Sequence, residues 1–195
     1  ANTLVGLNKE GSLSETDSVR KEQEILKRIR HKIFSARRPE TKRKLKAQDK
    51  EIREKIAQLL ESSGFLDSNS ADEMAKWDPY DQNTGAPFFD AEWMFGEKKK
   101  FDIIIGNPPY GVSIKGKYRK QVEKHLGKVP DYEIYYYFIE VAKKNLLDNG
   151  IMSYIIPNTY LFNTFAKKYR QSLLDYWNII EILDCTKFPI FESAT

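Results

Sequence analysis

A short apolar run that ends in a rigid turn constrains the fold of this 195-residue chain more than any other feature. The run Phe101–Ile105 is continuously apolar but for one aspartate, as expected of a parallel strand that is covered on both faces. After one glycine comes the turn Asn-Pro-Pro-Tyr, Asn107–Tyr110. A residue that precedes proline is held out of the helical region, so Asn107 and Pro108 are both expected to be extended. The strand must therefore stop here.

Two further apolar runs follow, Ile151–Ile156 and Asn178–Leu183, and amphipathic stretches lie between them. The first stretch predicts a helix from about Asp131 to Leu147, with Asn149-Gly150 as its left-handed stop. A second helix is expected from Asn158 or Thr159. Its inward residues would be Phe162, Ala166, Tyr169 and Leu173. Alternating strands and helices predict an α/β fold, a partial Rossmann-like parallel sheet of about three strands.

The N-terminal part has a different pattern. Apolar residues recur at helical spacing over Asp17–Ser35 and again over Glu40–Ser62, which predicts an antiparallel helical hairpin. Asp49 falls on the seam of the second helix and makes that seam imperfect. We expect residues 1–65 to form the hairpin and residues 66–195 the incomplete C-terminal part of a catalytic domain. Residues 65–100, dense in aromatics, predict an irregular cover with one short strand near Phe88–Asp90.

Charge is unevenly distributed. The net charge is +4, but residues 20–61 hold 15 Lys/Arg and 7 Asp/Glu. A basic arm of this kind is common in proteins that bind nucleic acid, and a solvated hairpin explains it equally well. No apolar run approaches the roughly 20 residues of a membrane helix. One cysteine, Cys185, and two histidines cannot form a Cys/His zinc site, so we expect no metal and a reducing, cytoplasmic setting.

The turn at 107–110 carries groups suited to an aromatic amino group, which presents two N–H donors. The Asn107 side-chain oxygen and the Pro108 carbonyl can each accept a hydrogen bond from one of these N–H groups. Neither proline has an N–H that would compete. Two acceptors off the ring plane localise the amino lone pair and stabilise the positive charge that develops when the nitrogen attacks a methyl donor. Tyr110 can stack on the base, an interaction of roughly 1–3 kcal/mol.

The turn resembles the catalytic motif of amino-methyltransferases, above all of adenine-N6 DNA methyltransferases with the class I S-adenosylmethionine-dependent fold. The resemblance covers about residues 88–195 and is closest to type IIG restriction–modification enzymes and related phage-defence methylases. Four weaker blocks stand in the family's order: 131–138, 149–158, 179–184 and 191–194. The resemblance implies methylation of a flipped adenine in double-stranded DNA, with Asn107, Pro108, Pro109 and Tyr110 as catalytic residues.

The resemblance also implies a second aromatic that sandwiches the adenine against Tyr110. Phe191 fits this role best and Phe188 is its rival, although both are equally well explained as loop anchors. After the catalytic turn, a lysine-rich segment that we expect to be a mobile loop offers contacts to DNA phosphates. The candidates are Lys115, Lys117, Arg119 and Lys120. A merely solvated loop is the alternative.

The glycine-rich cofactor loop of this class is not visible before Phe101. We therefore expect a fragment that binds S-adenosylmethionine weakly or not at all. The remainder of the methyltransferase domain and a target-recognition domain would be its missing partners. An exposed apolar sheet edge would favour a homodimer or a shielding segment. No convincing nuclease site is visible. The alternatives are a protein-glutamine or RNA amino-methyltransferase, or a non-catalytic fragment that binds nucleic acid or acts as a scaffold.

Overall fold

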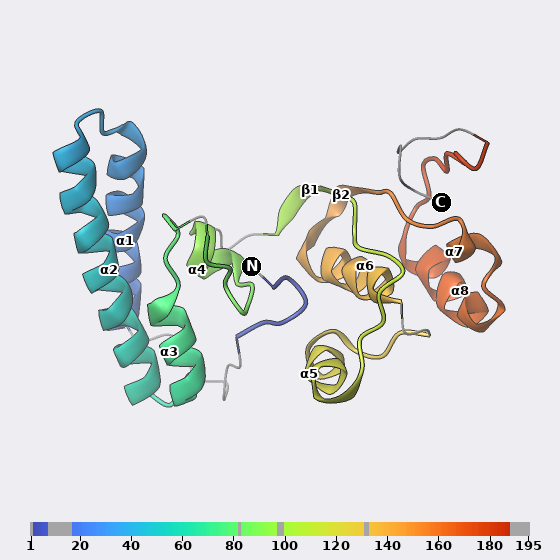
Figure 1. The fold of residues 1–195 in the computed structure, drawn as a ribbon, viewed down its shortest axis with the longest axis horizontal. Helices are drawn as coiled ribbons and strands as arrows, with labels where there is room; N and C mark the ends of the chain where they lie inside the picture. Colours follow the sequence, from blue (N-terminus) through green and yellow to red (C-terminus); the bar gives the residue numbers. More distant parts are fainter. Residues whose placement is uncertain (1, 8–16, 82, 97–99, 131–132, 188–195) are drawn as a thin grey trace. The chain divides into compact units, whose positions relative to one another are not determined.

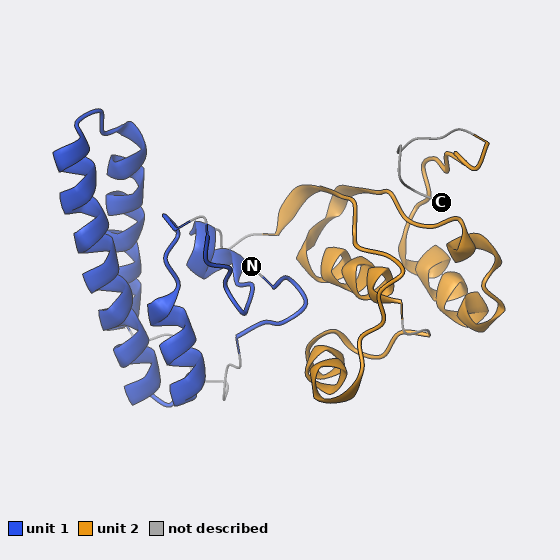
Figure 2. Ribbon diagram, in the orientation of Figure 1, with its two compact units in different colours: residues 1–99 blue, residues 100–195 orange. Residues whose placement is uncertain are grey.

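The computed structural model describes residues 2–7, 17–81, 83–96, 100–130 and 133–187. The chain divides into two compact units, residues 1–99 and residues 100–195 (Figure 2). The first is helical, and the second combines helices with a parallel strand pair, which confirms the predicted α/β class. The division into a hairpin, 1–65, and a catalytic part, 66–195, stays a prediction, because compactness assigns no function to either part.

Unit 1 is built on a long helical hairpin, α1 (Asp17–Ser35) and α2 (Pro39–Ser62) (Figure 1). Pro39 stands in the first turn of α2, where its missing N–H costs no hydrogen bond. Two shorter helices follow, α3 (Ser68–Lys76) and α4 (Ala91–Phe95). The short strand expected near Phe88–Asp90 is not formed, because the Asp90 side chain instead caps α4 by accepting from the Trp93 amide at 2.9 Å.

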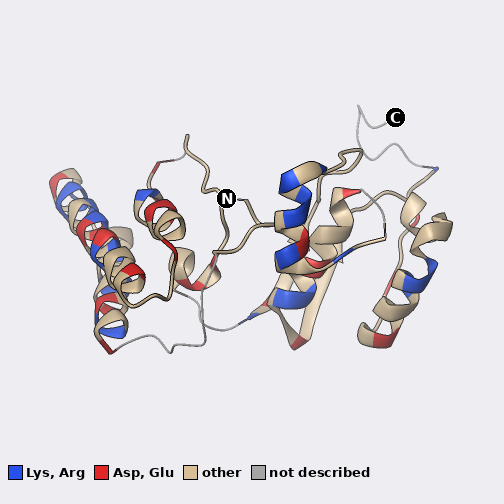
Figure 3. Ribbon diagram, turned by 90° about the horizontal axis from the view of Figure 1, so that it is seen from below, with Lys and Arg blue, Asp and Glu red and all other residues tan. Residues whose placement is uncertain are grey.

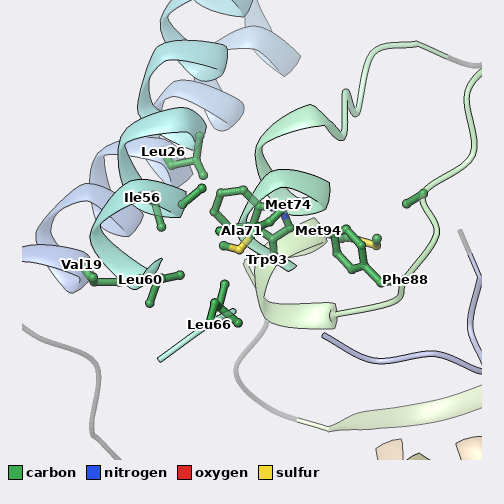
Figure 4. Close-up of a cluster of buried hydrophobic side chains, with 12 residues drawn as sticks. Val19, Leu26, Ile56, Leu60, Leu66, Ala71, Met74, Phe88, Trp93 and Met94 are labelled. Carbon is green, nitrogen blue, oxygen red and sulfur yellow. The ribbon is translucent and has the colours of Figure 1, made fainter. Parts of the chain in front are cut away.

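The core of unit 1 lies where the hairpin meets α3, α4 and the segment before α4 (Figure 4). The buried apolar side chains include Val19, Leu26, Ile56, Leu60, Leu66, Met74, Phe88, Trp93 and Met94. The aromatics Phe88 and Trp93 therefore anchor the irregular segment to the hairpin. Phe95, one residue further on, is exposed.

Asp49, the residue that breaks the apolar seam of α2, is fully buried. Its carboxylate accepts from Arg53 Nε at 2.7 Å, from Arg30 Nε at 3.0 Å and from the Tyr80 hydroxyl at 2.9 Å. Arg30 also donates to the Trp93 carbonyl at 2.7 Å. Burial, followed by the charge of Asp49, raises the pKa of Tyr80. The apparent flaw in the seam is thus a polar connection that ties both hairpin helices to residues 75–94.

Unit 2 contains the strands β1 (Phe101–Gly106) and β2 (Leu146–Tyr154), which pair in parallel. Its helices are α5 (Gly116–Leu126), α6 (Ile134–Asn145), α7 (Thr159–Phe162) and α8 (Lys167–Tyr176), with a 3₁₀ turn η1 (Thr164–Ala166) before α8. Ile103 pairs with Ile151 and Gly106 with Tyr154, after an irregularity near Asp102. Helices α5 and α6 lie on the crossover that a parallel pair requires.

The described part of the sheet has two strands rather than about three. Residues 178–183 are not paired, and the side chains of Ile180 and Leu183 are about four-fifths exposed, at 80% and 78%. On β1, Ile103 and Ile105 are exposed, although the sequence predicts a strand covered on both faces. Apolar composition therefore indicates that a strand forms here, but not whether other elements cover its two faces.

Two turn predictions also differ from the structure. Asn149 and Gly150 lie inside β2 and do not stop a helix; α6 already ends at Asn145. Gly150 has little free space, because a Cβ there would lie 2.9 Å from the Asp102 carbonyl oxygen. Glycine is needed here for a close approach of two strands. Downstream, Ala166 and Leu173 are buried as predicted, whereas Phe162 is exposed.

Candidate functional site

The turn Asn107–Tyr110 begins where the parallel pair ends. Gly106 is the last residue of β1 and pairs with Tyr154, the last residue of β2. One further hydrogen bond, from the Ile155 amide to the Gly106 carbonyl at 3.1 Å, fixes the chain just before Asn107. The turn therefore stands at the carboxyl edge of the sheet, where ligands bind in open α/β folds.

Within the turn, Pro108 is buried, while Asn107 and Pro109 are exposed. The Tyr110 side chain is partly open, with 40% of its surface exposed. In the part of the chain that the structure describes, the Asn107 side chain makes no hydrogen bond and no ion pair. Its amide is therefore available to an external group, on a backbone that the buried Pro108 holds in place.

The far end of the turn is fixed by Glu133, which stands just before α6. Its carboxylate accepts from the Gly111 amide at 3.1 Å, and the Ile134 amide donates to the Val112 carbonyl at 3.2 Å. Gly111 has a φ of +69°, a conformation that favours glycine. Sequence reasoning missed Glu133, because no local pattern shows that its side chain reaches back 22 residues.

Tyr154 supports the near end of the turn and was also missed. Its ring lies so close to Gly106 that a Cβ there would be 3.3 Å from Cε1 of the tyrosine. Its hydroxyl donates to the Phe138 carbonyl at 3.3 Å, and burial raises its pKa. Tyr154 thus connects the last residue of β1 to α6. The only sequence signal was an aromatic residue after the second apolar run.

The tyrosine-rich start of α6 packs inside the protein and is not a ligand surface. Tyr135, Tyr136 and Tyr137 are all buried. The Tyr136 ring meets Tyr169 edge-on, with ring centroids 5.5 Å apart. The Tyr169 hydroxyl donates to Glu140 at 2.6 Å. Burial, and then this bond, raise the pKa of Tyr169.

The basic segment after the turn is a helix, not the mobile loop that the sequence predicts. Lys115 immediately precedes α5, and Lys117 and Lys120 lie on α5 with exposed side chains. Arg119 is engaged within the protein, since its Nε donates to Glu123 at 2.8 Å. That hydrogen bond holds the pKa of Glu123 below its usual value. Of the four phosphate candidates, Arg119 is therefore the one with an internal structural role.

Other expectations concern the second aromatic, metals and membranes. Phe188, Phe191 and Asp131 lie outside the described residues. Within the described ranges, His, Cys, Asp and Glu form no group of three or more that could hold a metal ion. None of the helices in those ranges is both long and apolar enough to cross a membrane.

Comparison with known proteins places this fold and turn in a family. The model of the Eco57I restriction-modification methylase family matches residues 10–191. The chain therefore belongs to the Eco57I restriction-modification methylase family, which confirms the resemblance carried by the turn. No solved structure is significantly similar to the chain.

Individual relatives match a part of the chain. It is 33% identical over 95 residues to the type II methyltransferase M.BanIII of Aneurinibacillus aneurinilyticus, covering 48% of this chain and 16% of the relative. It is 34% identical over 82 residues to the type II methyltransferase M.TthHB8I of Thermus thermophilus, covering 35% and 18%. A putative type II restriction enzyme and methyltransferase of Methanocaldococcus jannaschii, RM.MjaORFECS2P, is 35% identical over 105 residues, covering 54% and 9%. The matches thus span less than a fifth of each relative.

Proposed function

We propose that this chain belongs to the catalytic part of an adenine-N6 DNA methyltransferase of a restriction–modification or phage-defence system. The observation that carries the proposal is the exposed Asn107 amide on a turn fixed at the carboxyl edge of a parallel strand pair. Membership of a restriction-modification methylase family supports it, as do relatives named as type II methyltransferases.

In the proposed site, the chain's own residues hold and orient the adenine amino group. The Asn107 side-chain oxygen and the Pro108 carbonyl each accept a hydrogen bond from one of its two N–H groups, which makes the nitrogen more tetrahedral and localises its lone pair. The same acceptors stabilise the positive charge that grows on the nitrogen as it gains a methyl group. The methylated nitrogen then loses one proton to solvent, so no strong base is required at the turn.

Tyr110 stacks on one face of the base in this proposal. An adenine within a duplex cannot reach the turn, so the base must be flipped out. Phe191, or its rival Phe188, remains the candidate for the opposite face. Phosphates beside the flipped base would be contacted by three exposed lysines that follow the turn: Lys115, just before α5, and Lys117 and Lys120 on α5.

S-adenosylmethionine is the proposed source of the methyl group, which it supplies as an electrophile. The residues at hand do not form its complete site, because the sequence before Phe101 lacks the glycine-rich loop of this class. We therefore assign no residue of this chain to the donor and expect the chain alone to bind it weakly or not at all.

The test measures transfer of a labelled methyl group to DNA by the full-length protein. It compares the unmodified protein with the Asn107→Ala variant. We expect a loss of about 100-fold or more, typical for removal of one group that stabilises developing charge. Asn178→Ala is the matched control, since Asn178 is also an exposed asparagine of unit 2. Retained activity in Asn107→Ala would reject the role. Labelling of RNA or protein in place of DNA would support the alternative substrates.

A further inference from the structure

Figure 3 marks Lys and Arg in blue, and many of them lie on the hairpin of α1 and α2. The tip of this hairpin, defined as residues 27–46, concentrates positive charge. It contains 10 Lys/Arg and a single acidic residue, Glu40. The adjoining residues 20–26 and 47–61 together contain 5 Lys/Arg and 6 Asp/Glu. The charge of the basic arm therefore resides almost wholly at the end of the hairpin that lies away from α3 (Figure 1).

Most cations of the tip are not used by the protein itself. Arg30 belongs to the buried Asp49 network, and Lys46 lies over the Tyr80 ring at 4.8 Å. The other eight are exposed and form no ion pair within the described ranges: Lys27, Arg28, Lys32, Arg37, Arg38, Lys42, Arg43 and Lys44. Below the tip the pattern changes, since Lys55 lies 2.6 Å from Glu22 and Lys50 lies 3.9 Å from Glu54.

Phe34 stands among these cations and is 96% exposed, although its neighbour Ile33 is buried. A single exposed aromatic is unremarkable on its own, but this ring contributes almost nothing to the core of unit 1. Beside a concentration of cations, an exposed aromatic provides a surface that can contact bases or sugars. The Asp49 network, which ties α1 to α2 and to Tyr80, gives the hairpin a fixed base from which the tip projects.

We propose that the hairpin tip binds the phosphate backbone of double-stranded DNA, with Phe34 lying against the groove. Charge complementarity selects a polyanion, and the choice of DNA rests on the proposed function. Backbone contacts of this kind supply affinity and orientation without sequence choice. They would place a second DNA contact on unit 1, separate in the chain from the lysines of α5.

The experiment measures binding of the 195-residue chain to a fluorescent DNA duplex by anisotropy, from 50 to 200 mM salt. The tip variant is Arg37→Gln/Arg38→Gln/Lys42→Gln. The control variant, Lys21→Gln/Lys167→Gln/Lys168→Gln, removes the same charge from other exposed positions. We expect the tip variant to bind about tenfold more weakly, with a salt slope lower by up to about three. The control variant should stay within about twofold of the unmodified chain.

Equal binding by the tip and control variants would overturn the proposal. So would tighter binding to anionic phospholipid vesicles than to DNA. Phe34→Ala keeps the charge, and we expect it to weaken binding while the salt slope stays the same. Far-UV circular dichroism checks that each variant is folded. This assay measures duplex binding and involves no methyl transfer, so failure of the catalytic proposal would leave this one standing, and the reverse also holds.

Discussion

Asp49 and Arg53, one turn apart on α2, form a fully buried ion pair with 2.7 Å between Oδ2 and Nε. We expect Asp49→Ala to lower the free energy of unfolding by about 3–5 kcal/mol, because two arginines would remain without their shared carboxylate. Denaturant unfolding followed by tryptophan fluorescence measures this. Asp72→Ala, which removes an exposed partner of Lys76, should change stability by less than about 1 kcal/mol. Similar losses in both variants would contradict the prediction.

Gly150 tests the close approach of the two strands in unit 2. In Gly150→Ala the new Cβ would lie 2.7 Å from Leu146 Cγ and 2.9 Å from the Asp102 carbonyl oxygen. We expect a loss of about 1–3 kcal/mol, as found when a packed site is overfilled. Gly85→Ala is the control, since no other atom lies within 4 Å of its added Cβ. Thermal unfolding of both variants provides the comparison.

The raised pKa of Tyr169 predicts that the stability of the chain changes at alkaline pH. Tyr169 has a raised pKa in the folded chain, whereas in the unfolded chain its pKa is about 10. Just above pH 10 its hydroxyl therefore stays protonated in the folded chain and ionises in the unfolded chain. The contribution of its hydroxyl is therefore fully present below pH 10 and declines above it. The stability difference between the unmodified chain and Tyr169→Phe should shrink by up to about 1.4 kcal/mol per pH unit above 10. A difference that stays constant from pH 8 to 11 would rule this out.

Tyr110 tests base stacking in the full-length protein. Tyr110→Phe keeps the ring and should retain methyl transfer to DNA. Tyr110→Ala should lose about 5- to 150-fold, the equivalent of roughly 1–3 kcal/mol for one stacked base. Labelled-methyl transfer at limiting DNA is the measurement. If the two variants lose the same activity, the hydroxyl rather than the stacked ring is important.

The sequence predicted features that depend on local signals. Helix α1 has the predicted limits, and α2 begins one residue early at Pro39. The start of β1 and the stop before Asn107 were also predicted, because proline geometry is local. The position of Asn107 at the sheet edge followed from the parallel topology.

Features that depend on distant partners were not predicted. Residues 178–183 have strand composition but no paired neighbour in the described part, and β propensity reflects context as much as sequence. The lysine-rich segment predicted to be a mobile loop is instead helix α5, in which Val122 is buried and Arg119 pairs with Glu123 one turn on. Two residues that support the turn are far from their contacts in sequence: Glu133 follows Gly111 by 22 residues, and Tyr154 follows Gly106 by 48. No periodicity is informative over such separations.

The Glu133–Gly111 contact has a practical consequence for dividing this protein. The segment that includes Asn107 is attached at both ends, at Gly106 to β2 and at Gly111 to the residue before α6. Any shortened version that stops before Glu133 would release both attachments at once, because β2 and α6 both follow that residue. The Asn-Pro-Pro-Tyr sequence would survive in such a peptide, but neither contact that fixes its ends would remain.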